Sequence, residues 1–157
     1  MRVLFVCLGN ICRSPSAEGV FRARLQRAGL AERVEVDSCG IGHWHVGKAP
    51  DERAQAAARK RGIDIAGLRA RVLDAADYRH FDYILAMDHD NLAAIEAGRP
   101  VDCRATVDLF LSYAGRPDDA VPDPYFGGDE GFETVLDLIE AASDGLIDEI
   151  RRRLAGS

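Results

Sequence analysis

A cysteine and an arginine separated by five residues, Cys7 and Arg13, enclose a short loop near the N-terminus. A cysteine thiolate is a nucleophile, and a helix N-terminus or a nearby cation lowers the pKa of a cysteine. The planar guanidinium of an arginine can bind two phosphate oxygens at once. Cys7 alone would be interpreted as a buried core residue, but with Arg13 it predicts thiolate chemistry on a phosphate group.

The residues around this pair predict a strand, a tight loop and the start of a helix. The apolar run Val3–Val6 is typical of a short buried strand. Gly9 and Asn10 tolerate positive φ, while Ser14 is a candidate N-cap with Pro15 at the first helical position. Such a loop directs backbone N–H groups and the positive end of a helix dipole at one point, which suits an anion.

A second candidate for chemistry is Asp123, which lies between Pro122 and Pro124 and is followed by Tyr125 and Phe126. The prolines favour extended backbone around Asp123, and a surface turn is the simplest interpretation of this stretch alone. A thiolate phosphatase, however, needs an acid for the leaving oxygen and then a base for water, and one carboxyl group can serve as both. The two aromatic rings could stack on an aryl substrate.

Strands alternate with helices along the rest of the chain. We expect strands at Val3–Val6, Val34–Ser38, Phe81–Met87 and Thr106–Phe110, and helices over 15–28, Pro50–Arg61, Asp74–His80, Asp88–Ala97 and 132–154. This alternation predicts one α/β domain over residues 1–157, with an open parallel four-stranded sheet and helices on both faces. Ligands of such sheets bind beyond the carboxyl ends of the strands, where the loop after the first strand lies.

Composition excludes several classes of function. The net charge of −6 argues against a nucleic-acid binder, and no apolar run approaches the length needed for membrane insertion. The four cysteines lack the spacing of a zinc site, and His43 and His45 are expected to be solvent-exposed loop residues and not metal ligands. The N-terminal apolar run is too short for a signal peptide, so we expect reduced thiols and a cytoplasmic protein.

The stretch Val6-Cys7-Leu8-Gly9-Asn10-Ile11-Cys12-Arg13-Ser14-Pro15 resembles the signature loop of the low-molecular-weight protein tyrosine phosphatases. Asp123-Pro124-Tyr125 resembles the general-acid loop of the same family. The two motifs stand at opposite ends of the chain in the family's order, and the resemblance covers nearly the full length. It implies hydrolysis of aryl phosphate monoesters in tyrosine-phosphorylated proteins or peptides, through a phosphocysteine intermediate, with inorganic phosphate as the product and without metal or other cofactor.

The resemblance also implies roles for individual residues. Cys7 would be the nucleophile, Arg13 the phosphate clamp and Asp123 the general acid and base. Ser14 would hydrogen-bond the thiolate, and Asn10 would hold the shape of the loop with Ser38 behind it. The other residues expected to contact phosphate or substrate are Leu8, Gly9, Ile11, Cys12, Trp44, Tyr125 and Phe126.

One departure from the family pattern concerns the support of the loop. Many relatives have a histidine where this chain has Leu68, so we expect this support to be weaker or built differently. Cys12 raises a separate hypothesis, since it could trap an oxidised Cys7 as a disulfide and make the site a redox-sensitive thiol. The alternative is that Cys12 simply packs under the loop.

Two other functions remain open on the sequence. An arsenate reductase on the same scaffold would need further thiols as a relay, but Cys39 and Cys103 form no evident pair. A non-catalytic module could bind anions or sense oxidants at the same loop. A nucleotide-binding loop is excluded because no Gly-Lys-Ser/Thr follows.

Overall fold

Four parallel strands form one sheet in the computed structural model, which describes residues 1–125 and 128–156. The strand order is β2-β1-β3-β4, and all three neighbouring pairs are parallel. The strands are β1 (Arg2–Cys7), β2 (Glu35–Gly40), β3 (Tyr83–Ala86) and β4 (Thr106–Leu109). The predicted open parallel four-stranded sheet is confirmed, with the Cys7 loop at the carboxyl end of its first strand.

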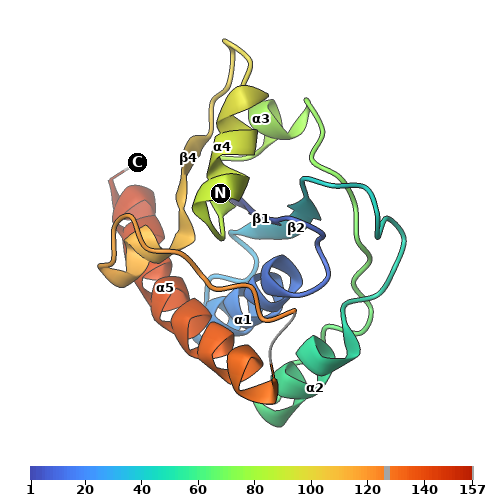
Figure 1. The fold of residues 1–157 in the computed structure, drawn as a ribbon. Coiled ribbons are helices and arrows are strands. Elements are labelled where there is room, and N and C mark those ends of the chain that lie inside the picture. Colours follow the sequence, from blue (N-terminus) through green and yellow to red (C-terminus); the bar gives the residue numbers. More distant parts are fainter. Residues whose placement is uncertain (126–127, 157) are drawn as a thin grey trace.

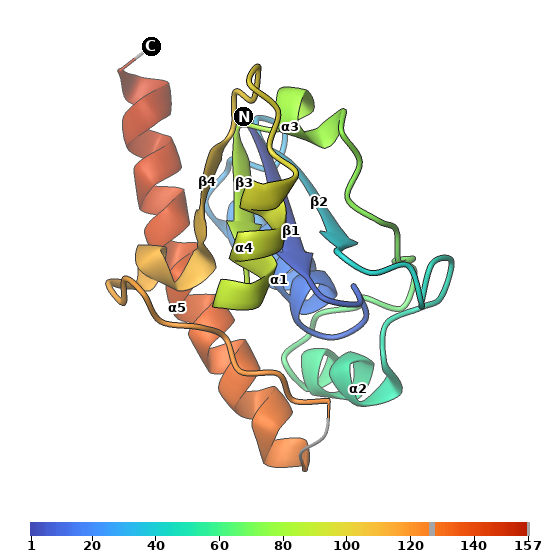
Figure 2. The same cartoon turned by 45° about the horizontal axis from the view of Figure 1, so that its top comes forward.

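Helices cover both faces of the sheet. In Figure 2, α4 (His89–Ala97) lies in front of the strands, while α1 (Arg13–Arg27) lies behind them. The long helix α5 (Asp129–Ala155) packs against α1 and η1 (Phe110–Ala114), whereas α2 (Glu52–Lys60) packs at the end of that layer (Figure 1). The short helix α3 (Asp77–His80) packs on the same face as α4.

The side chains of β1 alternate between the two apolar layers, as a strand buried on both faces requires. Val3 and Phe5 enter the larger core, which α1, α2 and α5 complete. Leu4 and Val6 point to the opposite face and pack with residues of α3, α4 and the neighbouring strands. Burial on both faces makes the strand rigid, so the loop that begins at Cys7 starts from a fixed point.

The predicted start of α1 was wrong. The helix begins at Arg13, with Cys12 at the N-cap position and no capping bond from the Cys12 side chain. Ser14 is already helical, and its hydroxyl faces Cys7 and Asn10 instead of capping the backbone. Pro15 is tolerated in the first turn because N–H groups there have no partner within the helix.

Other boundaries moved by a few residues for local reasons. Asp51 and Asp88 are N-caps of α2 and α4, each accepting a bond from a backbone N–H. The two helices therefore begin at Glu52 and His89, two residues and one residue after their predicted starts. β4 ends at Leu109 because Phe110 starts the 3₁₀ turn. Across the described part of the chain, no helix is both long enough and apolar enough to cross a membrane.

Candidate active site

The loop from Cys7 to Arg13 is held in place by backbone hydrogen bonds from two other segments, one that follows β2 and one at the start of α2. The chain beyond β2 continues the pairing, since the Ile41 amide donates to the Cys7 carbonyl at 3.0 Å. On the other side, the Asp51 amide at the start of α2 donates to the Ile11 carbonyl at 2.8 Å. The loop is therefore fixed from two directions, and the uncapped N-terminus of α1 faces the space that it encloses.

The backbone of this loop takes its left-handed residue at Asn10, which has a φ of 58°. Gly9, which was expected to share that role, does not have positive φ. Gly9 is needed for space instead, because a Cβ there would lie 2.9 Å from Cδ2 of His45. A side chain at residue 9 would have to displace the His45 ring.

Gly40, at the end of β2, lies close to the loop. A Cβ at this position would lie 3.0 Å from the Leu8 carbonyl oxygen and 3.2 Å from Cβ of Asn10. The backbone of Leu8 could not yield without distorting the loop. Glycine at residue 40 therefore allows the loop to pack directly on β2, a contact that the sequence pattern did not reveal.

A cavity of about 190 Å³ opens inside the loop. At its floor lies Cys7, a residue that is only 3% exposed. The Asn10 amide donates to Cys7 Sγ at 3.2 Å, and Ser14 Oγ lies 3.0 Å from the same sulfur. The residues lining the cavity are Cys7, Leu8, Gly9, Ile11, Cys12, Arg13, Trp44, His45, Asp123 and Tyr125.

Arg13 is fixed from behind by acceptors that leave the cavity side of its guanidinium available. Its Nη1 donates to Asp88 Oδ2 at 2.7 Å and to the Val121 carbonyl at 3.0 Å, and the residue is only 3% exposed. Its Nη2 lies 3.8 Å from Asp123 Oδ2. The clamp and the candidate general acid therefore face the same space above the Cys7 sulfur.

Asp123 is held at the mouth of the cavity by its own turn. Its Oδ1 accepts a bond from the Tyr125 amide at 3.0 Å, and its carboxylate side chain is 42% exposed. Arg53 of α2 braces the turn, because its Nη2 donates to the Tyr125 carbonyl at 2.9 Å and its guanidinium lies over the Tyr125 ring. The carboxylate can thus reach both a bound substrate and solvent water.

The walls of the cavity are apolar and aromatic. Trp44 is 62% exposed and stacks on His43, while Leu8 and Tyr125 also present large apolar surface to solvent. Phe126, expected as a further wall, lies outside the described residues. His45 is half-buried and lines the cavity, so the expectation of a solvent-exposed loop histidine was wrong for this residue.

Cys12 shares the cavity with Cys7 but differs in its electrostatics. Burial raises the pKa of Cys12 to about 12, and the negative charges of Asp51 and Cys7 add to the effect. Cys12 is therefore a neutral thiol near pH 7. Cys39 is buried on the opposite face of the sheet, and Cys103 packs against the same core, so neither lines this cavity.

A chain of buried polar side chains lies behind the loop. Asn10 Nδ2 donates to Ser14 Oγ at 2.8 Å and to Ser38 Oγ at 3.0 Å. Ser38 donates to the carboxylate of Glu18 at 2.7 Å. Leu68, which stands where many relatives have a histidine, packs against the larger apolar core.

Several site residues were missed from the sequence. Asp88 follows β3 at the carboxyl edge of the sheet, so the rule that placed the Cys7 loop could have identified it. Glu18 had no such signal, since a glutamate on a helix is normally solvent-exposed. Burial raises its pKa, while the Ser38 hydrogen bond and the charge of Arg22 oppose that rise.

Within residues 1–125 and 128–156, no cluster of histidine, cysteine and carboxylate side chains has the arrangement of a metal site. The groups that line the cavity include a thiol, a guanidinium, backbone amides and one carboxyl group. Such a set can form and break a bond to a tetrahedral phosphorus.

Comparison with known proteins agrees with this geometry. Residues 2–155 match the model of the family described as low molecular weight phosphotyrosine protein phosphatase. A Schizosaccharomyces pombe protein of that name is 51% identical over 149 residues, covering 93% of this chain and 95% of the relative. The crystal structure of a protein tyrosine phosphatase from Entamoeba histolytica with Hepes in its active site has a TM-score of 0.92 at 36% identity, covering 97% of each chain. The structure titled drosophila arginine phosphatase has a TM-score of 0.89 at 34% identity, covering 96% of this chain and 98% of that one.

Proposed function

This chain belongs to the low molecular weight phosphotyrosine protein phosphatase family, and we propose that it hydrolyses phosphotyrosine in proteins or peptides through a phosphocysteine intermediate on Cys7. The observation that carries this proposal is the convergence of three side chains on one cavity. The thiol of Cys7, the guanidinium of Arg13 and the carboxyl group of Asp123 all line it.

In the first step, the Cys7 thiolate attacks phosphorus and the bond from phosphorus to the phenolic oxygen breaks. Arg13 and the N–H groups of the loop and of the α1 N-terminus stabilise the non-bridging oxygens as charge moves onto them. Protonated Asp123 gives its proton to the leaving phenolic oxygen. The products are a free tyrosine side chain and a phosphate group bonded to Cys7 Sγ.

In the second step, water replaces the departed tyrosine. The Asp123 carboxylate takes a proton from this water while the water oxygen attacks phosphorus, and the bond from phosphorus to sulfur breaks. Inorganic phosphate leaves, Cys7 returns as a thiolate and Asp123 is again protonated. The exposure of Asp123 at the cavity mouth supports both roles, since one face of the group must reach solvent.

The shape of the cavity favours aryl esters. Trp44 and Tyr125 both line the cavity and are exposed to solvent, while Cys7 lies buried at the floor. A phosphotyrosine side chain is long enough to reach the floor with its ring between these walls. A phosphoserine side chain would stop short of the sulfur while its peptide backbone remained outside.

The proposed setting is a reducing compartment, for which the cytoplasm is the natural candidate. All four cysteines are free, and the proposed nucleophile acts only as a reduced thiol. An arsenate reductase would need a relay of further thiols. Of those in the chain, only Cys12 shares the cavity, and its raised pKa makes it a poor attacking group.

The test is turnover of p-nitrophenyl phosphate and a phosphotyrosine peptide, with a chelator present, by wild type and Cys7→Ser. Wild type should turn over both substrates, while Cys7→Ser should lose turnover but still bind vanadate. The control Cys103→Ser, away from the cavity, should match wild type. Substantial activity of Cys7→Ser would overturn the mechanism, and faster turnover of phosphoarginine or arsenate than of phosphotyrosine would overturn the substrate class.

A further inference from the structure

Arg71 lies outside the cavity, yet it contacts both Asn10 of the loop and two aspartates, Asp37 of β2 and Asp77 of α3. We propose that Arg71 is a positioning residue for the phosphatase reaction, with Asp37 and Asp77 as its anchors. Its anchored backbone N–H orients Asn10, which in turn directs the Ser14 hydroxyl at the Cys7 thiolate. This inference rests on the proposed function, since it assigns how the same nucleophile is stabilised.

The first link is the orientation of the side-chain amide of Asn10. The Arg71 backbone N–H donates to Asn10 Oδ1 at 3.0 Å. A backbone N–H can only donate, so it determines which end of the amide is oxygen. The Nδ2 group of Asn10 must then point the other way, where it donates to Ser14 and Ser38.

The second link is the direction of the bond between Ser14 and Cys7. Because Ser14 Oγ accepts a hydrogen from Asn10, its own hydrogen is available for another acceptor. Cys7 Sγ lies at 3.0 Å, whereas the Cys39 carbonyl, which Ser14 also faces, lies at 3.4 Å. A hydroxyl that donates to the thiolate stabilises the charged, nucleophilic form of the sulfur.

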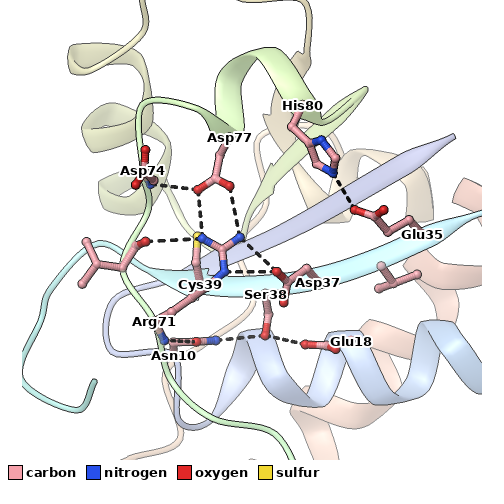
Figure 3. Close-up of polar contacts among 12 residues, drawn as sticks. Asn10, Glu18, Glu35, Asp37, Ser38, Cys39, Arg71, Asp74, Asp77 and His80 are labelled. Atoms are coloured by element: carbon pink, nitrogen blue, oxygen red, sulfur yellow. Dashed lines mark hydrogen bonds and ion pairs between the residues drawn. The ribbon is translucent and has the colours of Figure 1, made fainter. Parts of the chain in front are cut away.

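At the Glu18 end of this chain of polar side chains, the hydrogen bonds are consistent with the same orientation of Asn10. Ser38 accepts from Asn10 and donates to Glu18 Oε1 at 2.7 Å, and Glu18 is paired with Arg22. Figure 3 shows Asn10, Ser38 and Glu18 in a row along α1. Glu18 accepts a hydrogen bond at this end, and the Arg71 N–H donates one at the other end. Together they determine the direction of every hydrogen bond between them.

The anchors fix Arg71 on the opposite side from Asn10. Its Nε donates to Asp37 Oδ2 at 3.0 Å, and its two terminal nitrogens donate to the Asp77 oxygens at 3.0 and 3.1 Å. Figure 3 shows the guanidinium between these two carboxylates, which come from β2 and α3. Burial opposes the charge, but the hydrogen bonds of Asp77 and the charge of Asp37 hold the pKa of Arg71 above its ordinary value.

The backbone around Arg71 is joined to the edge of β2 as well. The Gly40 amide donates to the Arg71 carbonyl at 2.8 Å, and the Leu73 amide donates to the Gly40 carbonyl at 2.9 Å. Gly40 in turn packs on the backbone of Leu8. A shift of Arg71 would therefore be transmitted both to Asn10 and to the segment on which the loop rests.

Leu68 takes no part in orienting Asn10. Leu68 has no side-chain N–H group and packs against the apolar core, so it cannot donate to Asn10. The donor to Asn10 Oδ1 is the backbone of Arg71, three residues later.

The experiment compares Arg71→Met with Arg61→Met. Arg61 makes a matched control because it also binds several carboxylates, those of Glu133, Asp137 and Glu140, but it does not contact the loop. The readouts are kcat for p-nitrophenyl phosphate, thermal unfolding, and the pH dependence of Cys7 alkylation by iodoacetate, followed by peptide mass.

Arg71→Met should lower kcat about tenfold and move the alkylation midpoint up by about one pH unit, the scale of one weakened charge-assisted hydrogen bond. Arg61→Met should lower the unfolding temperature without moving that midpoint. Arg71→Lys, which can still pair with one aspartate, should fall between wild type and Arg71→Met.

An unchanged alkylation midpoint in a folded Arg71→Met protein would overturn the proposal and leave Arg71 a purely structural role. If Arg71→Met does not fold, Asp37→Asn decides, because asparagine keeps the oxygen that accepts the Ser38 amide and replaces the one facing Arg71. This variant should move the midpoint in the same direction, and no movement would again overturn the proposal. Failure of the proposed function would show separately, as turnover by Cys7→Ser.

Discussion

Asp88 uses its two carboxylate oxygens for two different partners, and one of them is Arg13. Its Oδ2 accepts from Arg13 Nη1 at 2.7 Å, while its Oδ1 accepts from the Asn91 amide at 2.7 Å and so caps α4. The orientation of Arg13, the proposed phosphate clamp, is therefore tied to the start of a helix on the opposite face of the sheet. The two functions of Asp88 can be separated by mutation.

Asp88→Asn should lower kcat/KM about 10- to 100-fold while keeping the cap of α4. Asparagine caps a helix as well as aspartate does, but it places an NH₂ group against the Arg13 guanidinium, and a hydrogen bond to a charged group is worth ~1.5–3 kcal/mol. Asp88→Ala should lose the cap too, at a further cost of about 1 kcal/mol in urea unfolding. Wild-type kinetics in Asp88→Asn would show that Arg13 needs no such partner.

Asp123→Asn should impair phosphotyrosine hydrolysis by about 10²- to 10⁴-fold, the scale expected for loss of a general acid. An ester of a very acidic phenol should suffer less, because its leaving oxygen needs no proton in the transition state. The measurement is kcat against a series of aryl phosphates of different phenol acidity. Equal losses across the series would instead assign Asp123 a structural role in its turn.

Trp44→Ala should narrow the preference for phosphotyrosine over phosphoserine peptides. Loss of one aromatic wall should lower kcat/KM for the phosphotyrosine peptide about tenfold, as expected for one aromatic contact, and change the slow phosphoserine rate little. Val46→Ala is the matched control, since Val46 is exposed on the same loop but does not line the cavity. Comparable wild-type rates on the two peptides would contradict the aryl cleft.

The parts of the site that follow from local pattern could be predicted from the sequence. The strand before Cys7 and the helix after Arg13 follow from an apolar run and from Pro15 near a helix start. The sheet rule then places their loop at an edge where ligands bind. The direction in which the Ser14 hydroxyl points could not be predicted this way. A serine near a helix start looks the same in sequence whether or not its hydroxyl caps the backbone.

Contacts between distant segments had no local signal. The pairing of Arg71 with Asp37 and the packing of Gly40 on Leu8 depend on how β2 lies beside the loop. The prediction that His45 is solvent-exposed failed for the same reason, since its half-burial arises from its approach to Gly9. Tertiary contact, and not local preference, decides each of these positions.

Wild type should lose stability relative to Glu18→Gln as the pH rises above the ordinary glutamate value of 4.5. Burial raises the pKa of Glu18 in the folded chain, so the unfolded chain releases this proton first and is favoured as pH increases. Below 4.5 both states are protonated and the difference is absent. Each unit of raised pKa corresponds to about 1.4 kcal/mol, measured by urea unfolding across the pH range. A stability difference that does not change with pH would contradict a raised pKa.

Oxidation of Cys7 should be more fully reversible where Cys12 is present. Peroxide converts the Cys7 thiolate to a sulfenic acid, and attack by the Cys12 sulfur would then form a Cys7–Cys12 disulfide and release water. Both sulfurs line the same cavity, but the pKa of Cys12 near 12 keeps its thiolate fraction small. Closure of the disulfide should therefore compete with further oxidation of Cys7, and it should become faster as pH rises.

The measurements are intact mass after a fixed dose of peroxide, and the activity regained when a thiol reductant is then added. Wild type should lose two hydrogens, show a crosslinked peptide of Cys7 and Cys12, and regain most of its activity. Cys12→Ser should accumulate oxygen adducts on Cys7 and recover much less, while Cys39→Ser, altered on the opposite face, should recover like wild type. Phosphate should protect both wild type and Cys12→Ser because it would cover Cys7. Oxygen adducts alone in wild type, with no crosslinked peptide, would show that Cys12 only packs under the loop.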